Sequence, residues 1–315
     1  MKVRRPGTPG GCLEMEFRHL RYFIAVAEEL HFARAAERLH IEQSPLSRAI
    51  KDLEFDLGVR LLERTTRTTR LTWAGQVFLD EAHRVLSTLE QTIASTKAAA
   101  AGYRGTLRIA LSDCIAQPWL AALLAQCREE EPDVEIRLFE VPLAEQVKGL
   151  RGGLYDAGFA QAGEVGEGIV VQSVWSDPLV IAVPARHPLL AHKRIPLVEL
   201  IRHPLVLCHP EICEGYYRQI ERILRAVDAE PIVAEHAATF DLMMTLVAAG
   251  YGLSFAKESH MMACRHPEVV ARPLAGRPLM LTTYFLRPNT EPSEPLSRFS
   301  TRVVAAENSN SSASA

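Results

Sequence analysis

A group of side chains that can donate hydrogen bonds to phosphate recurs at helical spacing near residue 48. At about 100° per residue, the segment 44–55 has an apolar side and an opposite side that carries hydroxyl, guanidinium and amine groups. The polar members of that side are Ser44, Ser47, Arg48 and Lys51. Such groups bind phosphate oxygens, and arginine can also bridge the O6 and N7 atoms of guanine. This face has the chemistry of a DNA contact, although a solvated helix in any small bundle would show the same pattern.

Three short helices are expected to position this face, because apolar residues recur at i, i+3, i+4 and i+7. The apolar positions are Leu20, Phe23, Ile24 and Ala27 in a helix over about 17–30, then Phe32, Ala35, Ala36 and Leu39, then Leu46, Ala49, Ile50 and Leu53. Residues 40–43 leave room only for a tight turn, and Ser44 as N-cap or Pro45 in the first turn suits the start of the third helix. This order is typical of a helix-turn-helix.

A short hairpin is predicted next, with strands over 61–64 and 70–72 around a polar turn over 65–69. Between Arg60 and Thr72 there are four arginines and one glutamate. Arginine beside threonine hydroxyls suits a contact with the DNA backbone or the minor groove. The hairpin is therefore interpreted as a wing, and an exposed hairpin without such a role is the alternative.

Five ordered segments resemble the N-terminal domain of LysR-type transcriptional regulators: 16–23, 35–40, 43–48, 57–64 and 71–75. The resemblance covers about residues 17–79 and implies a winged helix-turn-helix whose third helix enters the major groove. The DNA-contacting residues predicted from it and from the helical pattern are Phe32, Arg34, Gln43, Ser44, Pro45, Ser47, Arg48, Lys51, Arg64, Thr65 and Arg67. The family commonly has Ser or Thr where Glu42 stands, so this helix start is expected to lack the usual side-chain cap.

A long helix is predicted over 72–101, where proline is absent. Its apolar positions recur at steps of three or four: Phe78, Ala82, Val85, Leu89 and Ile93. About 28 residues extend roughly 42 Å, which a small domain cannot cover, so the stripe is expected to pair with a second copy of the chain. A core helix of one domain is the alternative. LysR relatives pair subunits through this helix, so the resemblance implies a homodimer or homotetramer that reads an inverted repeat.

Beyond residue 105, strands alternate with helices, which predicts parallel sheets. The expected strands are 107–111, 134–141, 155–160, 178–184, 203–208, 232–235 and 253–256, and the expected helices are 119–130, 145–150, 216–227 and 240–250. Two such lobes resemble the periplasmic-binding-protein-like effector domain of the LysR family. The predicted fold class is α/β multidomain: a winged helix-turn-helix, a long linker helix and a two-lobed α/β effector domain.

The predicted boundaries follow the changes in composition and pattern along the chain. They are an extension over 1–14, the DNA-binding domain over 15–72, a linker helix and hinge over 73–104, the effector domain over 105–303 and a disordered tail over 304–315. Lobe I is expected over about 105–174 and 269–303, and lobe II over about 175–268. Met1 and Met15 are both candidate starts.

Ligands of open α/β sheets bind beyond the carboxyl ends of strands, where helix N-termini offer N–H groups. Residues that follow four predicted strands form the predicted effector-binding set: Ser112, Asp113, Cys114, Leu143, Gln161, His209, Pro210 and Glu211. The chain resembles most the family's regulators of aromatic degradation, which typically bind a carboxylate with hydroxyls at the first two strand ends. Leu143 has no hydroxyl and Asp113 is acidic, so a neutral or aromatic ligand competes with a carboxylate.

Enzyme chemistry is not indicated, because the sequence has no Walker pattern, no H-E-x-x-H and no G-x-S-x-G. No catalytic residue, metal or cofactor is therefore expected. Cys208, His209 and Cys213 are close enough to suggest a metal or a thiol switch, although their spacing does not match zinc-site patterns. Redox sensing through Cys208 and Cys213 remains an alternative to a small-molecule effector.

Charge is unevenly distributed, although the net formal charge is only −3. Residues 1–103 contain 15 Lys and Arg against 13 Asp and Glu, and the remainder contains 20 against 25, which indicates different partners for the two parts. No apolar stretch approaches the ~20 residues of a membrane span, and the basic start lacks an apolar signal segment. A cytoplasmic protein without membrane contact is expected.

The combined interpretation is a transcriptional regulator that binds double-stranded promoter DNA through 15–72 and a small molecule through 105–300, with RNA polymerase as a further candidate partner. A different class of protein stays open at this point. It is a solute-binding or enzymatic α/β protein whose first domain only mediates association.

Overall fold

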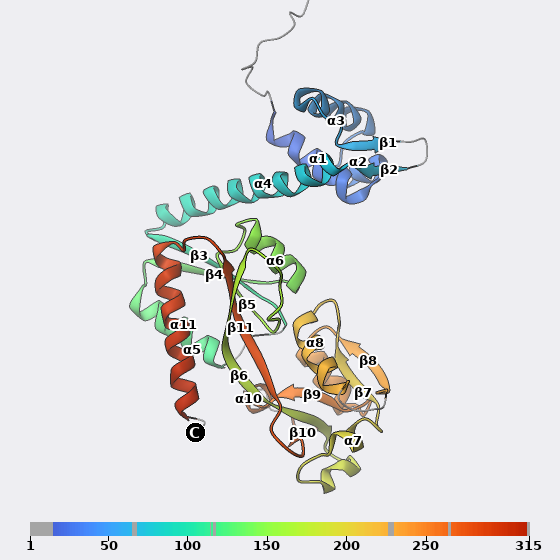
Figure 1. Ribbon diagram of the computed structural model, residues 1–315, viewed down its shortest axis with the longest axis vertical. Helices are drawn as coiled ribbons and strands as arrows, with labels where there is room; N and C mark the ends of the chain where they lie inside the picture. The colour runs from blue at the N-terminus through green and yellow to red at the C-terminus, as the bar shows by residue number, and fades with distance from the viewer. Residues whose placement is uncertain are drawn as a thin grey trace, which may run out of the picture. The chain divides into compact units, whose positions relative to one another are not determined.

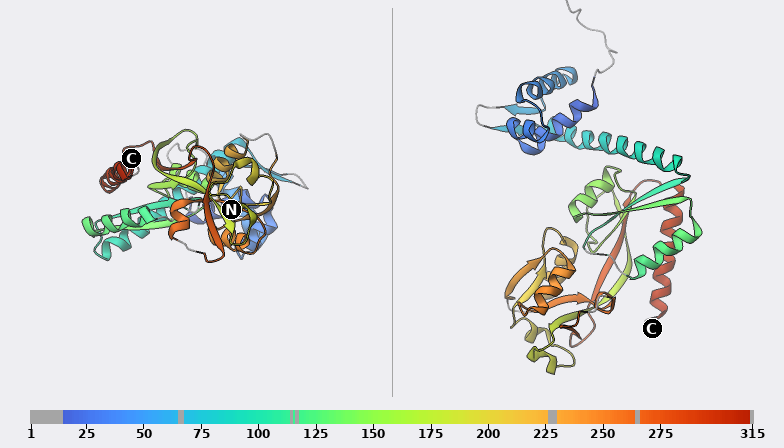
Figure 2. Two further views of the ribbon diagram at one scale, coloured as in Figure 1. Left: turned by 90° about the horizontal axis from the view of Figure 1, so that it is seen from below. Right: turned by 180° about the vertical axis from the view of Figure 1, so that it is seen from behind.

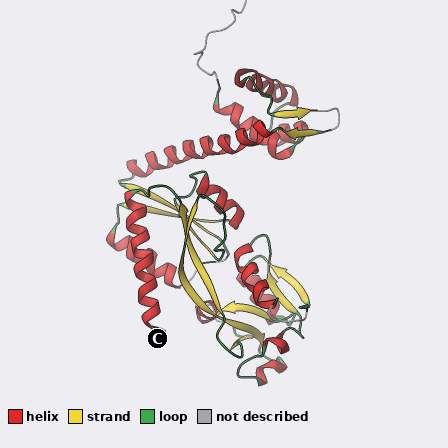
Figure 3. Cartoon of the chain, viewed as in Figure 1, coloured by secondary structure: helices red, strands yellow, loops and turns green. Residues whose placement is uncertain are grey.

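The structure is a computed structural model that describes residues 15–64, 68–113, 115, 118–225, 230–263 and 266–313. Contacts divide the chain into two compact units, residues 1–93 and 94–315. Figure 1 labels the helices and strands, and Figure 3 shows that helices dominate the first unit whereas the second mixes helices and strands.

The first unit is a small helical core with a two-stranded hairpin. Its elements are α1 (Phe17–Glu29), α2 (Phe32–Arg38), α3 (Gln43–Leu57), β1 (Leu62–Arg64), β2 (Thr69–Leu71) and α4 (Trp73–Ala100), the last of which continues into the second unit. The predicted apolar stripes meet in one cluster, in which Phe23, Leu46 and Ile50 are completely buried. The helix-turn-helix and the hairpin are confirmed.

The predicted start of α3 is wrong by one or two residues. The N-cap is Glu42 rather than Ser44, and the helix begins at Gln43. Glu42 makes no side-chain cap hydrogen bond, as expected from the loss of Ser or Thr at that position. The helix forms because its buried apolar stripe, ending in Leu53, stabilises it without a capping side chain.

The second unit is built on a seven-stranded sheet in the order β10–β6–β11–β5–β3–β4, with β9 paired to β6. Its strands are β3 (Gly105–Leu111), β4 (Val134–Glu140), β5 (Ala157–Ala160), β6 (Ile169–Pro184), β9 (Ser254–Lys257), β10 (Val269–Pro273) and β11 (Met280–Pro288). A separate parallel pair joins β7 (Leu205–Cys208) to β8 (Val233–Ala237). The prediction of parallel sheets is therefore only partly right, because β6, β9, β10 and β11 pair antiparallel.

Two long antiparallel strands, β6 and β11, join two lobes, as both views of the domain show (Figures 1 and 2). One end of the pair meets β5 in lobe I, and the other end of β6 meets β9 and β10 in lobe II. The predicted return to lobe I at residue 269 is wrong, because β10 pairs with residues 180–184 of β6. The chain returns to lobe I along β11 instead.

Helices cover both lobes. In lobe I they are α5 (Pro118–Glu130), α6 (Leu143–Arg151) and α11 (Glu294–Ala313); in lobe II they are a 3₁₀ turn (Pro188–Ala191), α7 (Leu197–Leu200), α8 (Glu214–Leu224), α9 (Phe240–Ala248) and α10 (Glu258–Ala263). Helix α11 lies beside α5 (Figure 2) and buries Leu296, Phe299 and Val303. The predicted unstructured tail over 304–315 is wrong as far as Ala313, because α11 continues to that residue. Once a helix has formed, each added residue gains one hydrogen bond when its backbone is fixed, so extension costs less than starting a helix.

Candidate nucleic-acid interface and effector pocket

The outer face of α3 presents the predicted DNA-contacting residues together. An open surface groove is lined by Gln43, Ser44, Ser47, Arg48 and Lys51. All are exposed except Ser47, which is half-buried. Two cations, Arg48 and Lys51, line this groove, and no side chain caps the start of the helix. Both features suit the binding of a polyanion.

Three other residues predicted to contact DNA make contacts within the protein instead. Arg34 is exposed but donates to the backbone oxygen of Glu29 at 2.6 Å. Arg64 is three-quarters buried, and its guanidinium lies 4.5 Å from the ring centroid of the half-buried Phe32. Phe32 and Arg64 therefore position the wing rather than offering free donors. Thr65 and Arg67 lie outside the described residues.

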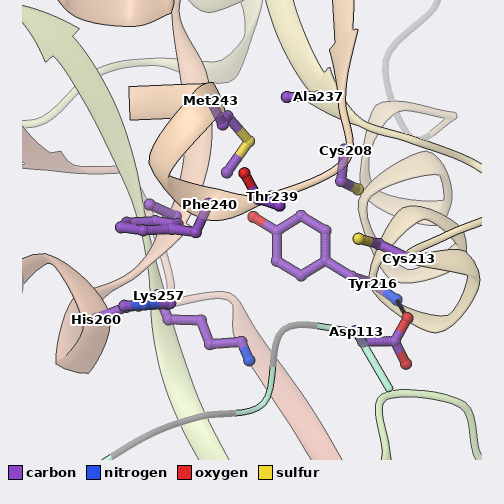
Figure 4. A pocket seen from close by; sticks show the side chains of 11 residues that line it. Asp113, Cys208, Cys213, Tyr216, Ala237, Thr239, Phe240, Met243, Lys257 and His260 are labelled. Carbon is purple, nitrogen blue, oxygen red and sulfur yellow. Dashed lines mark hydrogen bonds between the residues drawn. The ribbon is translucent and has the colours of Figure 1, made fainter. Parts of the chain in front are cut away.

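A pocket opens between the lobes and encloses about 360 Å³ of empty space, its open mouth included. Among the described residues, Asp113 contributes from lobe I, and the other lining residues come from lobe II: Cys208, Cys213, Tyr216, Ala237, Thr239, Phe240, Met243, Ala256, Lys257 and His260 (Figure 4). The walls are mainly apolar, which is usual for small-molecule sites.

Asp113 joins the two lobes through its carboxylate. Oδ1 accepts hydrogen bonds from the backbone N–H groups of Gly215 at 2.8 Å and Tyr216 at 3.2 Å, at the N-terminus of α8. Oδ2 accepts from the N–H of Gln161 at 2.9 Å and from the hydroxyl of Ser112 at 3.0 Å. The carboxylate is buried and satisfied by four donors from both lobes.

A second bridge lies one turn further along α8. The Nε2 atom of Gln219 donates to the carbonyls of Gln161 at 2.6 Å and Thr282 at 2.8 Å, and its Oε1 accepts from the N–H of Thr282 at 3.0 Å. The hydroxyl of Tyr216 donates to the carbonyl of Phe255 at 2.7 Å, which fixes the ring in the pocket. One face of α8 therefore holds both lobes and one wall of the pocket.

A cationic group lies on the other side of the pocket. Lys257, at the end of β9, is only 3% exposed, and its amine points toward the side of the pocket where Asp113 lies (Figure 4). His260 stacks on Phe240 with ring centroids 3.7 Å apart. Burial, and next the positive charge of Lys257, lower the pKa of His260 to about 4, whereas Asp241 opposes the shift. The imidazole is therefore neutral near pH 7.

Comparison with known proteins identifies both domains of the chain. Residues 17–76 match the model of the bacterial regulatory helix-turn-helix protein, lysR family, and residues 100–306 match the LysR substrate binding domain. The chain belongs to the LysR family. It is a DNA-binding transcriptional regulator with an effector-binding domain, and this family is not enzymatic. The alternative of a solute-binding protein with a mere association domain is thereby excluded.

Individual LysR relatives match over most of their length. The chain is 36% identical to the uncharacterized HTH-type transcriptional regulator YnfL of Escherichia coli (strain K12), over 77% of this chain and 82% of the relative. It is 34% identical to AlsR of Bacillus subtilis (strain 168), over 78% and 81%. The crystal structure of full-length CbnR complexed with its target DNA matches with a TM-score of 0.68 and 30% identity, over 93% of this chain and 100% of that chain.

Of the predicted effector-binding residues that the structure of this LysR protein describes, Asp113 alone lines the pocket. Ser112 and Gln161 are buried beside Asp113 and bond to it. Leu143 is wrong as a ligand contact, because it is the first residue of α6 and its side chain is 3% exposed in an apolar core cluster of lobe I. His209, Pro210 and Glu211 form a turn after β7 outside the pocket, where the Nδ1 atom of His209 accepts from the N–H of Glu211. Cys114 lies outside the described residues.

Two of the pocket residues that were missed lie at other strand ends. Thr239 comes two residues after β8, and Lys257 ends β9. The predicted set drew on four strand ends and left out these two. Thr239 also caps α9, its hydroxyl accepting from the N–H of Leu242.

The thiol and metal alternatives receive no support. Cys208 and Cys213 line the pocket but are only 5% and 4% exposed, so an oxidant in solvent reaches neither sulfur easily. Cys213 donates to the carbonyl of Ala238 at 3.6 Å. Among the described residues, no group of three or more His, Cys, Asp or Glu side chains is placed to hold a metal ion. The described helices also include none with the length and apolar character of a membrane span.

Proposed function

We propose that this LysR-type regulator binds promoter DNA with the outer face of α3 and that a small molecule in the pocket between its lobes changes the activity of the promoter. The observation that carries the first part is the groove of Gln43, Ser44, Ser47, Arg48 and Lys51. These side chains combine amide, hydroxyl and cationic donors on one exposed helix, which is the chemistry of base and phosphate contacts. The protein acts in the cytoplasm, without a metal or an organic cofactor.

The assembly in this proposal is a homodimer or homotetramer that reads an inverted repeat. Support comes from α4, a helix of 28 residues on which Val85 and Ile93 of the predicted stripe are 44% and 48% exposed. A long helix with an exposed apolar stripe is typical of a surface that pairs with another helix. Two α3 helices presented by a two-fold axis would meet two half-sites of one promoter. RNA polymerase is the candidate partner for transmitting the ligand signal.

The effector in this proposal is small and mainly apolar or aromatic. Phe240, Met243 and Tyr216 supply aromatic and apolar wall, and Lys257 supplies a buried cation. Ligand binding would change the closure of the two lobes, because the pocket is lined from both.

A salt titration of DNA binding tests the orientation of α3. The intergenic region beside the protein's own gene supplies the duplex, and footprinting locates the protected inverted repeat. Arg48→Ala and Lys51→Ala are each expected to reduce the slope of log affinity against log salt by about 0.9 for every phosphate that the side chain neutralises. Arg202→Ala is the matched control, because Arg202 is an exposed cation of the effector domain. Equal slopes for the wild type and both α3 variants would refute this orientation.

A further inference from the structure

The carboxylate of Asp113 lies at a place in the cleft that is built to bind an anion. Two of its donors are N–H groups at the N-terminus of α8, a helix of 11 residues, and a third is the N–H of Gln161 from the other lobe. A helix N-terminus with converging amides favours a negative charge, and hydrogen bonds to a carboxylate are stronger than neutral ones. In this chain the anion is a side chain of the protein itself.

The backbone around Asp113 is adapted to that arrangement. Asp113 has a φ of +59°, in the left-handed region that aspartate and asparagine tolerate better than most residues. Opposite it, a Cβ on Gly215 would come within 2.5 Å of Asp113 Oδ2 and 2.8 Å of the backbone N of Ala162. Only glycine lets α8 approach lobe I this closely. The left-handed backbone of Asp113 and the absence of a side chain at Gly215 together allow one carboxylate to lie between the lobes.

We infer that Asp113 determines the ligand specificity of the pocket, because its own carboxylate occupies the anion-binding position between the lobes. The effector therefore binds without placing a carboxylate at that position. This inference rests on the proposed effector function and names the ligand class. The part of the pocket left to a ligand has the stacked Phe240 and His260, Met243 and the buried amine of Lys257 (Figure 4). It takes a small apolar or aromatic molecule.

Replacement of Asp113 should open the anion position to a free carboxylate. Asp113→Gly removes the side chain and keeps the left-handed backbone without strain. The N–H groups of Gln161, Gly215 and Tyr216 would then lack their acceptor, and formate or acetate is small enough to supply one. Asp113→Asn is the matched control, because it tolerates the same backbone and still fills the position with a side chain of equal size.

The experiment is thermal unfolding and titration calorimetry of the full-length protein with formate or acetate, against sodium chloride at equal ionic strength. Asp113→Gly is expected to unfold at a lower temperature than the wild type and to be stabilised saturably by either anion. Its affinity for them should exceed that of the wild type by at least about tenfold. The wild type and Asp113→Asn should respond no more than they do to chloride.

The results that would overturn the inference differ clearly from those that support it. An Asp113→Gly protein that ignores both anions, or equal responses from all three proteins, would overturn the inference. Should Asp113→Gly not fold, Asp113→Ser takes its place; recovery of folded protein by formate supports the inference, and failure of both variants to respond opposes it. None of these readouts involves DNA, so loss of operator binding by the wild type would refute the proposed function without affecting this result.

Discussion

The guanidinium of Arg64 lies over the ring of Phe32 and at the same time donates to Glu54 Oε2 at 3.2 Å. The other oxygen of Glu54 accepts from the N–H groups of Leu61 and Leu62, at 2.9 and 3.0 Å. The first wing strand is therefore attached to α2 and α3 by one arginine and one glutamate. Their side chains are 25% and 15% exposed, so the pair is largely withdrawn from water.

Arg64→Ala is expected to lower the free energy of unfolding of the first unit by about 1–3 kcal/mol, because it leaves the Glu54 carboxylate partly buried without its cation. Arg64→Lys should recover only part of this loss, since an ammonium cannot stack on Phe32 and reach Glu54 with the geometry of a planar guanidinium. Urea unfolding of the three proteins measures the difference. Equal midpoints would show that Arg64 is not a structural residue.

The sequence predicted the first unit well because its signals are local. Apolar spacing identified all three helices, and the missing cap at Glu42 was expected from one residue. Arg64 shows the limit of that reasoning: its position in a basic hairpin suggests a DNA contact, but the acceptor that holds it, Glu54, is ten residues away and faces it only after folding. Composition identifies a cation and cannot identify its partner.

The effector domain was harder to predict because its site depends on long-range pairing. The strand-end rule selected Asp113 correctly as a pocket residue, but its partners at Gly215 and Tyr216 are more than 100 residues away. Leu143 fails because apolar residues after a strand serve the core as often as a cleft. The predicted return to lobe I at residue 269 is wrong because the alternation of side chains along a strand does not reveal which neighbouring strand it pairs with.

Acid should destabilise the effector domain through His260. The folded chain keeps this imidazole neutral down to about pH 4, whereas the unfolded chain protonates it below about pH 6.5. Between these values the unfolded state binds more protons, so stability falls as pH falls. The expected loss is about 2 kcal/mol, less than the full shift would give because the ring is only half-buried.

His260→Phe keeps an aromatic ring against Phe240 and has no proton to bind. Urea midpoints of the wild type and this variant, measured at pH 7 and pH 4.5, should therefore diverge toward acid. Parallel pH profiles would show that His260 does not contribute to the acid sensitivity of the domain.

Gln146 and Gly158 are expected to be energetically coupled in lobe I. The wholly buried Gln146 donates from Nε2 to the carbonyls of Ala110 at 2.9 Å and Phe159 at 3.0 Å. A Cβ on Gly158 would lie 2.2 Å from that nitrogen, so Gly158→Ala displaces the amide. Once Gln146→Ala has removed the amide, Gly158→Ala should cost less, with a coupling energy of about 1–2 kcal/mol. A double-mutant cycle by urea unfolding measures it, and strict additivity would contradict the expectation.

The attachment of α11 to α5 depends on Arg302. Its guanidinium donates to Glu130 at 2.6 Å and to Glu131 at 2.5 Å, and Arg298 donates to Glu131 at 2.9 Å. Hydrogen bonds from Arg298, and then from Arg302, lower the pKa of Glu131 despite its burial. Because Arg302 and Glu131 are only 15% and 14% exposed, this pair differs from the surface ion pairs that contribute little.

Arg302→Ala is expected to lower the free energy of unfolding of the effector domain by about 1–3 kcal/mol, since Glu131 keeps Arg298 but loses its more buried partner. Arg225→Ala, which breaks an exposed pair with Glu221 on α8, is the control and should change stability by less than about 0.5 kcal/mol. Urea unfolding at pH 7 measures both. If the two variants lose equally little, the contact between α5 and α11 depends mainly on the apolar side chains of α11, because Leu296, Phe299 and Val303 are buried in the core of lobe I and would remain in place.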